Sequence, residues 1–530
     1  MQVVEKPRVR VTTHGDVRLP PVLAPEQPKS SAQYMRGEDS PFFFNWTPAL
    51  RDQREDVQAA YTRAAARAID AMHNSGWLAG AVEQALSATV GNGLRIAAQP
   101  DADALRWDKK TAATWARMVE RRFESWAKEP IEVDAAGKQS LGQLARSVTK
   151  SSFTHGETLG LLPSVRRSAS ETKTKVKLLP AHKLTQDTDG MRQFQGVRMT
   201  AWGLPVSYSV MMNLGQGYEE KIEIPARDGL NRAQVLHIFD GEADQVRGIT
   251  SMAPALRVIR QYDQLADATL QASLIQAIFA ATVESDAPTE DILRALQDHD
   301  EQKQGVGSPS IDGLLQAKTG WYKNTKIDLG RGGRIAHLFP GEKLAFNASK
   351  TPNDTYEAFA KFLLREVARC LGLTFETLTG DYSGATYSSV RMSTSETWPI
   401  VLARRENIVG RFYQIVFETW LDEQVSDGKI EFPGGYAAFR AMRRDACRAS
   451  WRGPAKPQAD DLKTAKAFEV YKRMGIMSDE RICADLGYDW EDEYEQRQRE
   501  MEMRTELGLP ETDTLEPVAD PIADKLVTQD

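Results

Sequence analysis

The sequence has few cysteines, few histidines and no long apolar run. Its three cysteines, Cys370, Cys447 and Cys483, are far apart and predict neither a disulfide framework nor a CxxC metal motif. The first residues lack the basic-then-apolar pattern of a signal peptide, and no apolar run reaches the ~18 residues that span a bilayer. We therefore expect synthesis in the cytoplasm, reduced cysteines and no membrane partner.

An excess of positive charge is also missing. The formal net charge is −7 over 530 residues, which argues against a protein that coats DNA through a broad basic face. Neutralising phosphates with Lys and Arg supplies most non-specific DNA affinity, so any contact with DNA is expected to be weak. A length prior of about 150 residues per domain gives roughly three to four structural units.

The common catalytic motifs are absent as well. The nearest string to a P-loop, Gly137-Lys138-Gln139, lacks the hydroxyl residue and has Glu132 in place of the first glycine. There is no HExxH and no GxSxG, and His155 is best read as a histidine at a helix end. We expect no catalytic residue, no metal and no cofactor.

Two acidic pairs leave an alternative open. Asp101 with Asp103, and Asp187 with Asp189, could supply carboxylates to a two-metal nuclease. Both pairs stand beside turn formers, where Asp accepts backbone hydrogen bonds, and we favour that role. Two interpretations of the function therefore stay open at this point: a DNA-processing nuclease subunit and a ring-shaped structural adaptor.

The spacing of apolar residues predicts a mainly helical α+β protein. Helices are expected at 57–72 and 78–90, the second ending at Gly91-Asn92-Gly93. Period-two alternation between 157 and 240 predicts a β-rich module, and an alanine-rich stripe then predicts a long helix to about Glu284.

The second half of the chain has the same helical character. A further long helix is expected to start near Asp354, to bury Phe359 among others and to end at Gly372. Residues 374–391 are rich in Gly, Ser, Thr and Tyr and predict a loop, and Pro399 is expected to kink the next helix or mark its start. Three C-terminal helices precede a tail without predicted structure.

Six groups of short strings, taken in order, resemble the lambda family of phage portal proteins. They are Val90-Gly91-Asn92-Gly93-Leu94; Ile224-Pro225-Ala226 with 235–239; Arg247-Gly248-Ile249-Thr250 before Ala253-Pro254; Leu338-Phe339-Pro340-Gly341-Glu342; 371–373 with 378–383 and 387–391; and Trp451-Arg452-Gly453-Pro454 with 487–490. Each string alone is weak evidence, but their shared order over residues 50 to 510 is strong.

The resemblance implies a phage portal fold with wing, stem, clip and crown, assembled as a ring. By position, the parts are an extended N-terminal arm (1–48), the wing (49–250), a stem helix (251–284), the clip (285–345), a second stem helix (346–373), a tunnel loop (374–391), the wing return and crown helices (392–507) and a flexible tail (508–530).

The implied function is a DNA channel at one capsid vertex, used to package, retain and eject the genome. The expected partners are further copies of the chain in a dodecameric ring, double-stranded DNA, the terminase large subunit, a head-tail adaptor, and the major capsid and scaffolding proteins. The tunnel loop contributes Gly380, Asp381, Tyr382, Ser383, Gly384, Tyr387, Ser388 and Arg391. The basic cluster in the clip, expected to dock terminase or the adaptor, is Lys318, Lys323, Lys326, Arg331 and Arg334. The protein is expected in the virion, at the portal vertex.

Overall fold

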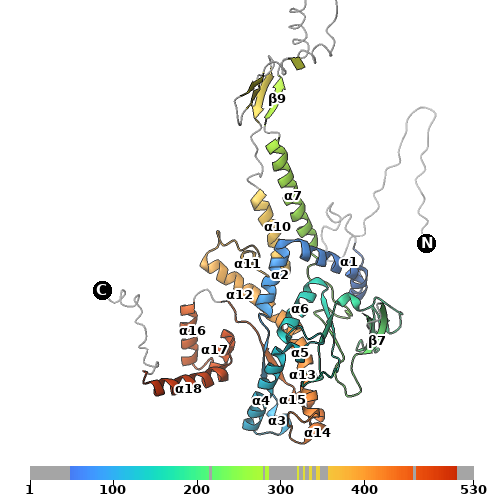
Figure 1. Ribbon diagram of the computed structural model, residues 1–530, viewed down its shortest axis with the longest axis vertical. Coiled ribbons are helices and arrows are strands. Elements are labelled where there is room, and N and C mark those ends of the chain that lie inside the picture. Colours follow the sequence, from blue (N-terminus) through green and yellow to red (C-terminus); the bar gives the residue numbers. More distant parts are fainter. Residues whose placement is uncertain are drawn as a thin grey trace, which may run out of the picture. The chain divides into compact units, whose positions relative to one another are not determined.

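The computed structural model describes most of the chain from Pro48 to Leu509 (Figure 1). The described residues are 48–213, 218–278, 281–285, 319–320, 326–328, 334–336, 342–346, 356–457 and 461–509. The chain divides into two compact units, Met1–Asp52 and Gln53–Asp530, and the helices and strands below belong to the second. The expected N-terminal arm, with its apolar segment 42–46, lies almost wholly outside the described residues.

Helices dominate the described part of the fold. In the first half they are α1 (Gln53–Asn74), α2 (Gly76–Thr89), α3 (Ala102–Leu105), α4 (Lys109–Lys128), α5 (Pro130–Val133), α6 (Leu141–Thr154), the short η1 (Ala181–Lys183) and α7 (Leu256–Ile278). In the second half they are α10 (Tyr356–Leu371), α11 (Phe375–Thr379), α12 (Tyr387–Arg404), the π-helical η3 (Arg405–Gly410), α13 (Arg411–Ser426), α14 (Gly435–Ala441), α15 (Arg443–Ala446), α16 (Asp461–Arg473), α17 (Asp479–Leu486) and α18 (Trp490–Leu507).

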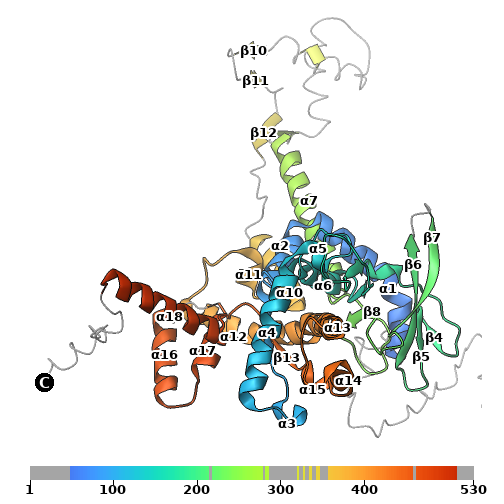
Figure 2. The same cartoon turned by 60° about the horizontal axis from the view of Figure 1, so that its bottom comes forward.

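The strands form small antiparallel sheets. They are β1 (Arg95–Ala98), β2 (Glu157–Leu161), β3 (Lys177–Leu179), β4 (Gln193–Phe194), β5 (Val197–Met199), β6 (Pro205–Asn213), β7 (Glu219–Pro225), β8 (Val235–Phe239), β9 (Ala281–Ser285), β10 (Lys326–Asp328), β11 (Arg334–Ala336), β12 (Glu342–Phe346) and β13 (Ala449–Arg452). The orders are β4-β5-β6-β7, β3-β2-β8, β1-β13, β10-β11 and β12-β9. Figure 2 shows β4 to β7 side by side, which confirms the β-rich module between residues 157 and 240.

The predicted helices of the first third are present. The α1 stripe, including Val57, Tyr61 and Ala68, is buried, and α2 ends before Gly91, whose φ of +59° is the left-handed conformation that favours glycine. The main core joins α4 and α6 to α13 through large aromatic side chains such as Phe123, which meets the Trp420 ring at 5.1 Å.

One prediction about the long helices needs correction. The helix predicted to reach Glu284 ends at Ile278, and Ala281–Ser285 forms β9, where Val283 lies opposite Leu344 of β12. Thr282 and Val283 favour a strand once a partner strand is available, and that partner comes about sixty residues later in the chain. The start expected near Asp354 lies outside the described residues, but α10 ends as predicted before Gly372.

Pro399 neither starts nor ends a helix. It stands inside α12, which continues to Arg404 and passes into the π-helical turn η3. All three cysteines are free, as expected. None of the helices in the described ranges is both long and apolar enough to cross a membrane.

Candidate functional site

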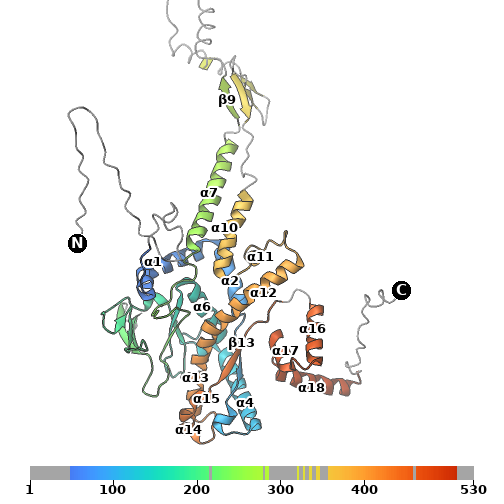
Figure 3. The same cartoon turned by 180° about the vertical axis from the view of Figure 1, so that it is seen from behind.

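The predicted stem corresponds to α7 and α10, which lie side by side (Figure 3). Near α2 both helices are buried in one apolar cluster, which contains Val258 and Ile259 of α7 and Leu363 and Val367 of α10. Both helices also expose large apolar side chains, those of α7 farther along the helix from this cluster and those of α10 on the side turned away from it. These are Leu270, Leu274, Phe359 and Phe362, with exposed fractions of 60%, 55%, 52% and 59%. The prediction that Phe359 is buried is therefore wrong for the single chain.

The segment predicted as a loop at 374–391 is only partly a loop. Thr374 caps α11 by accepting a hydrogen bond from the Thr377 amide at 3.0 Å, and Gly380 ends that helix with a φ of +68°. Thr386 then caps α12 in a capping box with Ser389. The serines and threonines that suggested a loop act as helix caps, so the irregular part is a turn of residues 380–386.

The predicted channel residues are divided between this turn and the helix that follows. Gly380, Asp381, Tyr382, Ser383 and Gly384 lie in the turn, as predicted. Tyr387, Ser388 and Arg391 belong to α12, which begins at Tyr387.

The charge of the turn is compensated within the chain. Asp381 is its one charged residue, and it accepts hydrogen bonds from the Ser383 hydroxyl at 2.6 Å and the Ser383 amide at 3.0 Å. The Lys361 ammonium of α10 lies 3.0 Å from the same carboxylate. The Ser383 hydroxyl and Lys361 together hold the pKa of Asp381 well below its usual range. The Asp381 carboxylate is therefore paired with a lysine that also pairs with Glu357, and Tyr382 next to it is exposed.

A cavity of about 980 Å³ lies beside the turn and α12. Tyr382 and Arg391 both line it, together with Trp398 of α12 and with Phe468 and Tyr471 of α16. The structure thus brings two of the predicted channel residues to the same cavity.

The string Arg247-Gly248-Ile249-Thr250 holds the segment that leads into α7. The Arg247 guanidinium is completely buried, and its Nε lies 2.9 Å from each carboxylate oxygen of Glu157, which is also completely buried. Glu157 also accepts a bond from the Gly248 amide at 2.9 Å, and the Tyr61 ring covers the guanidinium at 4.6 Å. A Cβ at Gly248 would come within 2.1 Å of the Gly156 carbonyl oxygen, so only glycine fits this contact.

Glu157 was not singled out by the sequence analysis. It lies just after a helix end, beside His155, and no sequence pattern indicates that an acidic residue there forms a buried ion pair. Burial raises the pKa of Glu157, but Arg247 and His237, whose Nε2 lies 3.0 Å from the carboxylate, bring it down to about 2. This buried pair ties β2 to the start of the predicted stem.

Two other strings of the resemblance, far apart in sequence, meet in the fold. Arg405 donates to the Thr89 carbonyl and, through Nη2, to the Pro454 carbonyl at 2.9 Å, joining the end of α2 to the segment after β13. A Cβ at Gly453 would lie 2.4 Å from the Arg405 Nε, and one at Gly91 would lie 2.6 Å from the Pro454 ring. The strings at 90–94 and 451–454 are therefore two halves of one junction.

The basic cluster predicted in the clip is described only in part. Lys326 and Arg334 lie in β10 and β11, which pair antiparallel with Asp328 opposite Arg334. Lys318, Lys323 and Arg331 lie outside the described residues. The structure therefore confirms strands at this place and leaves the docking role a prediction.

The acidic pairs considered for a nuclease are used in local structure. Asp187 forms an ion pair with Lys221 at 2.6 Å, and Asp189 accepts hydrogen bonds from the amides of residues 191 to 193. Asp101 caps α3 and pairs with Arg448. Within the described ranges, no group of three or more His, Cys, Asp or Glu side chains could hold a metal ion. Asp189 and Asp101 therefore have the turn and cap roles that we favoured, whereas Asp187 forms an ion pair.

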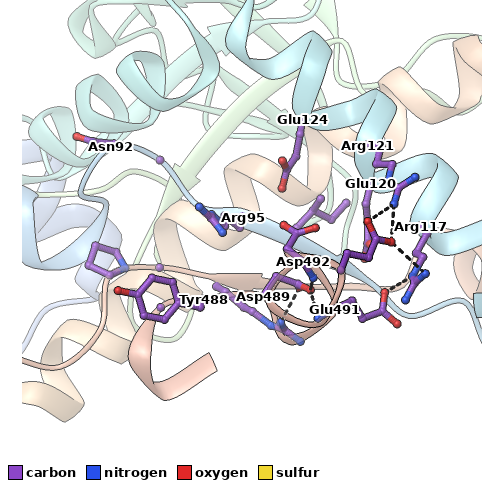
Figure 4. Close-up of a pocket in the computed structure, with 17 residues that line it drawn as sticks. Asn92, Arg95, Arg117, Glu120, Arg121, Glu124, Tyr488, Asp489, Glu491 and Asp492 are labelled. Atoms are coloured by element: carbon purple, nitrogen blue, oxygen red, sulfur yellow. Dashed lines mark hydrogen bonds and ion pairs between the residues drawn. The ribbon is translucent and has the colours of Figure 1, made fainter. Parts of the chain in front are cut away.

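The C-terminal helices contact α4 through charged side chains around a pocket of about 230 Å³ (Figure 4). Arg117 pairs with Glu491, Arg121 pairs with Glu495 at 2.9 Å, and Arg452 pairs with the α18 cap Asp489 at 3.0 Å. No residue of α17 or α18 is buried. Ion pairs are therefore prominent in the attachment of α18.

Glu120 stands among these charges and accepts a hydrogen bond from the Ala98 amide at 2.6 Å. Burial raises its pKa to about 7, the Ala98 amide acts against this shift, and the nearby carboxylates of Asp489 and Glu491 add to it.

A family model and two portal proteins identify the same family. A family model described as phage portal protein, lambda family, matches residues 41–405. The portal protein of Escherichia phage N15 is 25% identical over 508 residues, which are 93% of this chain and 95% of that protein. Portal protein B of Escherichia phage lambda is 24% identical over 504 residues, 93% of this chain and 94% of that protein. A chain from the neck of a native gene transfer agent particle, computed with C12 symmetry, is 12% identical with a TM-score of 0.43 and covers 82% of this chain and 93% of that one.

Proposed function

The chain belongs to the lambda family of phage portal proteins, and from this premise we propose that about twelve copies close into a ring that forms the DNA channel at one capsid vertex. The family match over residues 41–405 carries the proposal, because it includes both predicted stem helices and the turn between α11 and α12. The exposed apolar side chains of α7 and α10 support it, since such surfaces in a single chain usually mark contacts with another chain.

We propose that residues 374–391 line the narrow part of this channel. Strong phosphate contacts would oppose sliding, because each contributes ~1 log unit of salt dependence to binding. The turn has no net cation, since Lys361 already pairs with Asp381, and Tyr382 is exposed at its tip. Loose steric contact of this kind fits a segment that retains or gates packaged DNA without gripping it.

The proposed docking site for the terminase large subunit, and later for the head-tail adaptor, is the basic cluster within residues 285–345. Arg side chains suit the recognition of acidic partners. We also propose that the ring contacts the major capsid and scaffolding proteins, because it occupies a vertex of the capsid. The site of action is then the virion, with assembly in the host cytoplasm.

We further propose that the protein performs no chemistry of its own. The carboxylates that could have served a nuclease are engaged in turns, caps and ion pairs. Metal-dependent cleavage of DNA that disappears in Asp187→Ala/Asp189→Ala would contradict this proposal.

Imaging of the purified chain tests the proposed function. We expect negative-stain images and native mass spectrometry to show closed rings of about twelve subunits without added cofactor. Rings of a neighbouring size would leave the function intact. Monomers and dimers alone, across a wide concentration range, would contradict it.

A further inference from the structure

The cavity of about 980 Å³ that α12 and α16 line has an excess of positive charge, and we call it the α12–α16 cavity. The cations that line it are Arg391, Arg405, Arg452, Lys456 and Lys463. Among the described lining residues only Asp485 carries a carboxylate. This excess is local, because the chain as a whole has a formal net charge of −7.

Three of these cations have no carboxylate partner in the part of the chain that the structure describes. Arg452 is compensated by two carboxylates at 3.0 Å. Arg405, in contrast, donates only to backbone carbonyl oxygens, and Lys456 donates to the Ser395 hydroxyl at 2.8 Å. Arg391 is exposed and forms no ion pair with a described residue. Burial lowers the pKa of Arg405 to about 10, which still leaves its guanidinium charged at neutral pH.

Aromatic side chains form another part of the wall. Phe468 and Tyr471 of α16 and Trp398 of α12 line the cavity, and Tyr471 is 45% exposed. None of residues 462–473 of α16 is buried, so this helix has little apolar packing against the body of the fold. A ligand that matches these walls carries apolar side chains as well as carboxylates.

The sequence that follows the last described residue has this chemistry. Residues 510–530 contain six carboxylate side chains and one lysine. Three times, an apolar residue is followed within two positions by a carboxylate: Leu515 by Glu516, Val518 by Asp520, and Ile522 by Asp524. The segment therefore alternates groups that suit the aromatic wall with groups that suit the cations.

The segment is close enough to reach the cavity of its own chain. Asp485 of α17 lines the cavity, and α18 begins shortly afterwards at Trp490. Because α18 has 18 residues, its end lies about 27 Å from its start. The 21 residues 510–530 span up to about 70 Å when extended. Such a tether raises the local concentration of the segment to the order of millimolar.

We propose that residues 510–530 bind in the α12–α16 cavity of the same subunit. The carboxylates of the segment pair with Arg391 and Lys456, and its apolar side chains cover Phe468 and Tyr471. The segment thereby fastens α16 to α12. It also lies beside Tyr382, which lines the same cavity, and so it restricts the turn between α11 and α12.

Photocrosslinking in the full chain tests the proposal. Tyr471→p-benzoylphenylalanine should crosslink to residues 510–530 within one subunit, as identified by mass spectrometry of the peptides. Tyr494→p-benzoylphenylalanine is the matched control, because Tyr494 is 43% exposed and is closer to the segment in sequence. We expect it to crosslink to the segment about fivefold less, since the bound segment is concentrated at the cavity.

Charge reversal tests the pairing itself. Arg391→Glu/Lys456→Glu should reduce the crosslink from position 471 by about fivefold, because two attractive pairs become repulsive. Adding Glu516→Lys/Asp520→Lys to the same chain should restore the crosslink.

A control and a second measurement separate the possible failures. Lys109→Glu/Lys110→Glu on exposed positions of α4 reverses the same number of charges and should leave the crosslink unchanged. If circular dichroism shows that the replacement at Tyr471 disturbs folding, hydrogen exchange decides instead. Amides of residues 510–530 should then exchange more slowly in the parent chain than in Arg391→Glu/Lys456→Glu.

The proposal is overturned by equal crosslinking from the two tyrosine positions, or by a crosslink that joins two subunits into a covalent dimer. Equal hydrogen exchange in the parent and the reversed variant would have the same meaning. These measurements do not require ring formation, so their failure is distinct from failure of the proposed function.

Discussion

At the scale of single residues, the buried pair of Glu157 and Arg247 is the most sensitive point in the described fold. Glu157→Gln leaves Arg247 without a counter-charge, and breaking one partner of a buried pair costs about 3–5 kcal/mol. We expect a lower midpoint in urea unfolding at neutral pH, whereas Glu55→Gln, exposed on α1, should have almost no effect.

The pH dependence of this effect follows from the low pKa of Glu157. Its native pKa is about 2 against a usual 4.5, so its contribution to stability is present above pH 4.5 and is lost as the pH falls toward 2. The difference between the parent chain and Glu157→Gln should shrink over this window. A difference that stays constant down to pH 3 would show that charge pairing is not its cause.

The pKa of Glu120 is shifted in the opposite direction, so its effect on stability depends on pH in the opposite way. Its native pKa of about 7 lies above the usual 4.5, so the native state holds the proton more tightly and ionisation weakens the fold as the pH rises from 4.5 to 7. Glu120→Gln retains an acceptor for the Ala98 amide and removes the charge beside Asp489 and Glu491. We expect it to protect α18 against hydrogen exchange at pH 8 and to make little difference below pH 4.5. Faster exchange of α18 in this variant at pH 8 would contradict the argument.

At the scale of elements, the turn between α11 and α12 is the part whose length matters most. Deleting Gly380 to Gly384 removes the exposed Tyr382, the Asp381 carboxylate and the glycine that ends α11, while both flanking helices keep their N-terminal caps at Thr374 and Thr386. We expect rings that still assemble but particles that lose DNA or fill incompletely, as measured by genome length and by nuclease sensitivity of the packaged DNA.

The matched control for this deletion is Asp381→Asn. It keeps the length of the turn and an acceptor for Ser383, so packaging should be close to normal. Full and stable particles from the deletion variant would remove the retention role from this turn. A structure of the ring with Tyr382 far from the central axis would do the same.

At the scale of the whole molecule, docking and assembly should be separable. Arg331→Glu/Arg334→Glu reverses charge in the predicted docking cluster, far along the sequence from α7 and α10. We expect normal rings with impaired terminase binding, measured by pull-down and by packaging yield. Arg63→Glu/Arg67→Glu on exposed positions of α1 is the control. Normal packaging by the Arg331→Glu/Arg334→Glu variant would show that docking occurs elsewhere.

Family membership could be determined from the sequence, and the comparisons confirm it. Some of the strings that carried the resemblance include a glycine in close contact, such as Gly248 against the Gly156 backbone and Gly453 against the Arg405 side chain. Such contacts leave a mark on the sequence because few side chains fit them. The residues that pair with these strings have no such signal. Nothing in the sequence around Glu157 indicates that it pairs with Arg247, 90 residues later.

The sequence by itself determined most helices, because a helix depends on neighbours three and four residues away and on caps at its ends. Periodicity alone was sufficient for α1 and α2. The tertiary structure decided what depends on distant partners: β9 exists because β12 pairs with it, and Phe359 is exposed because α10 buries its other side on α2 and α7. An apolar stripe on a helix shows that a surface must be covered. Whether the same chain or a neighbouring chain covers it is decided only when the chain has folded.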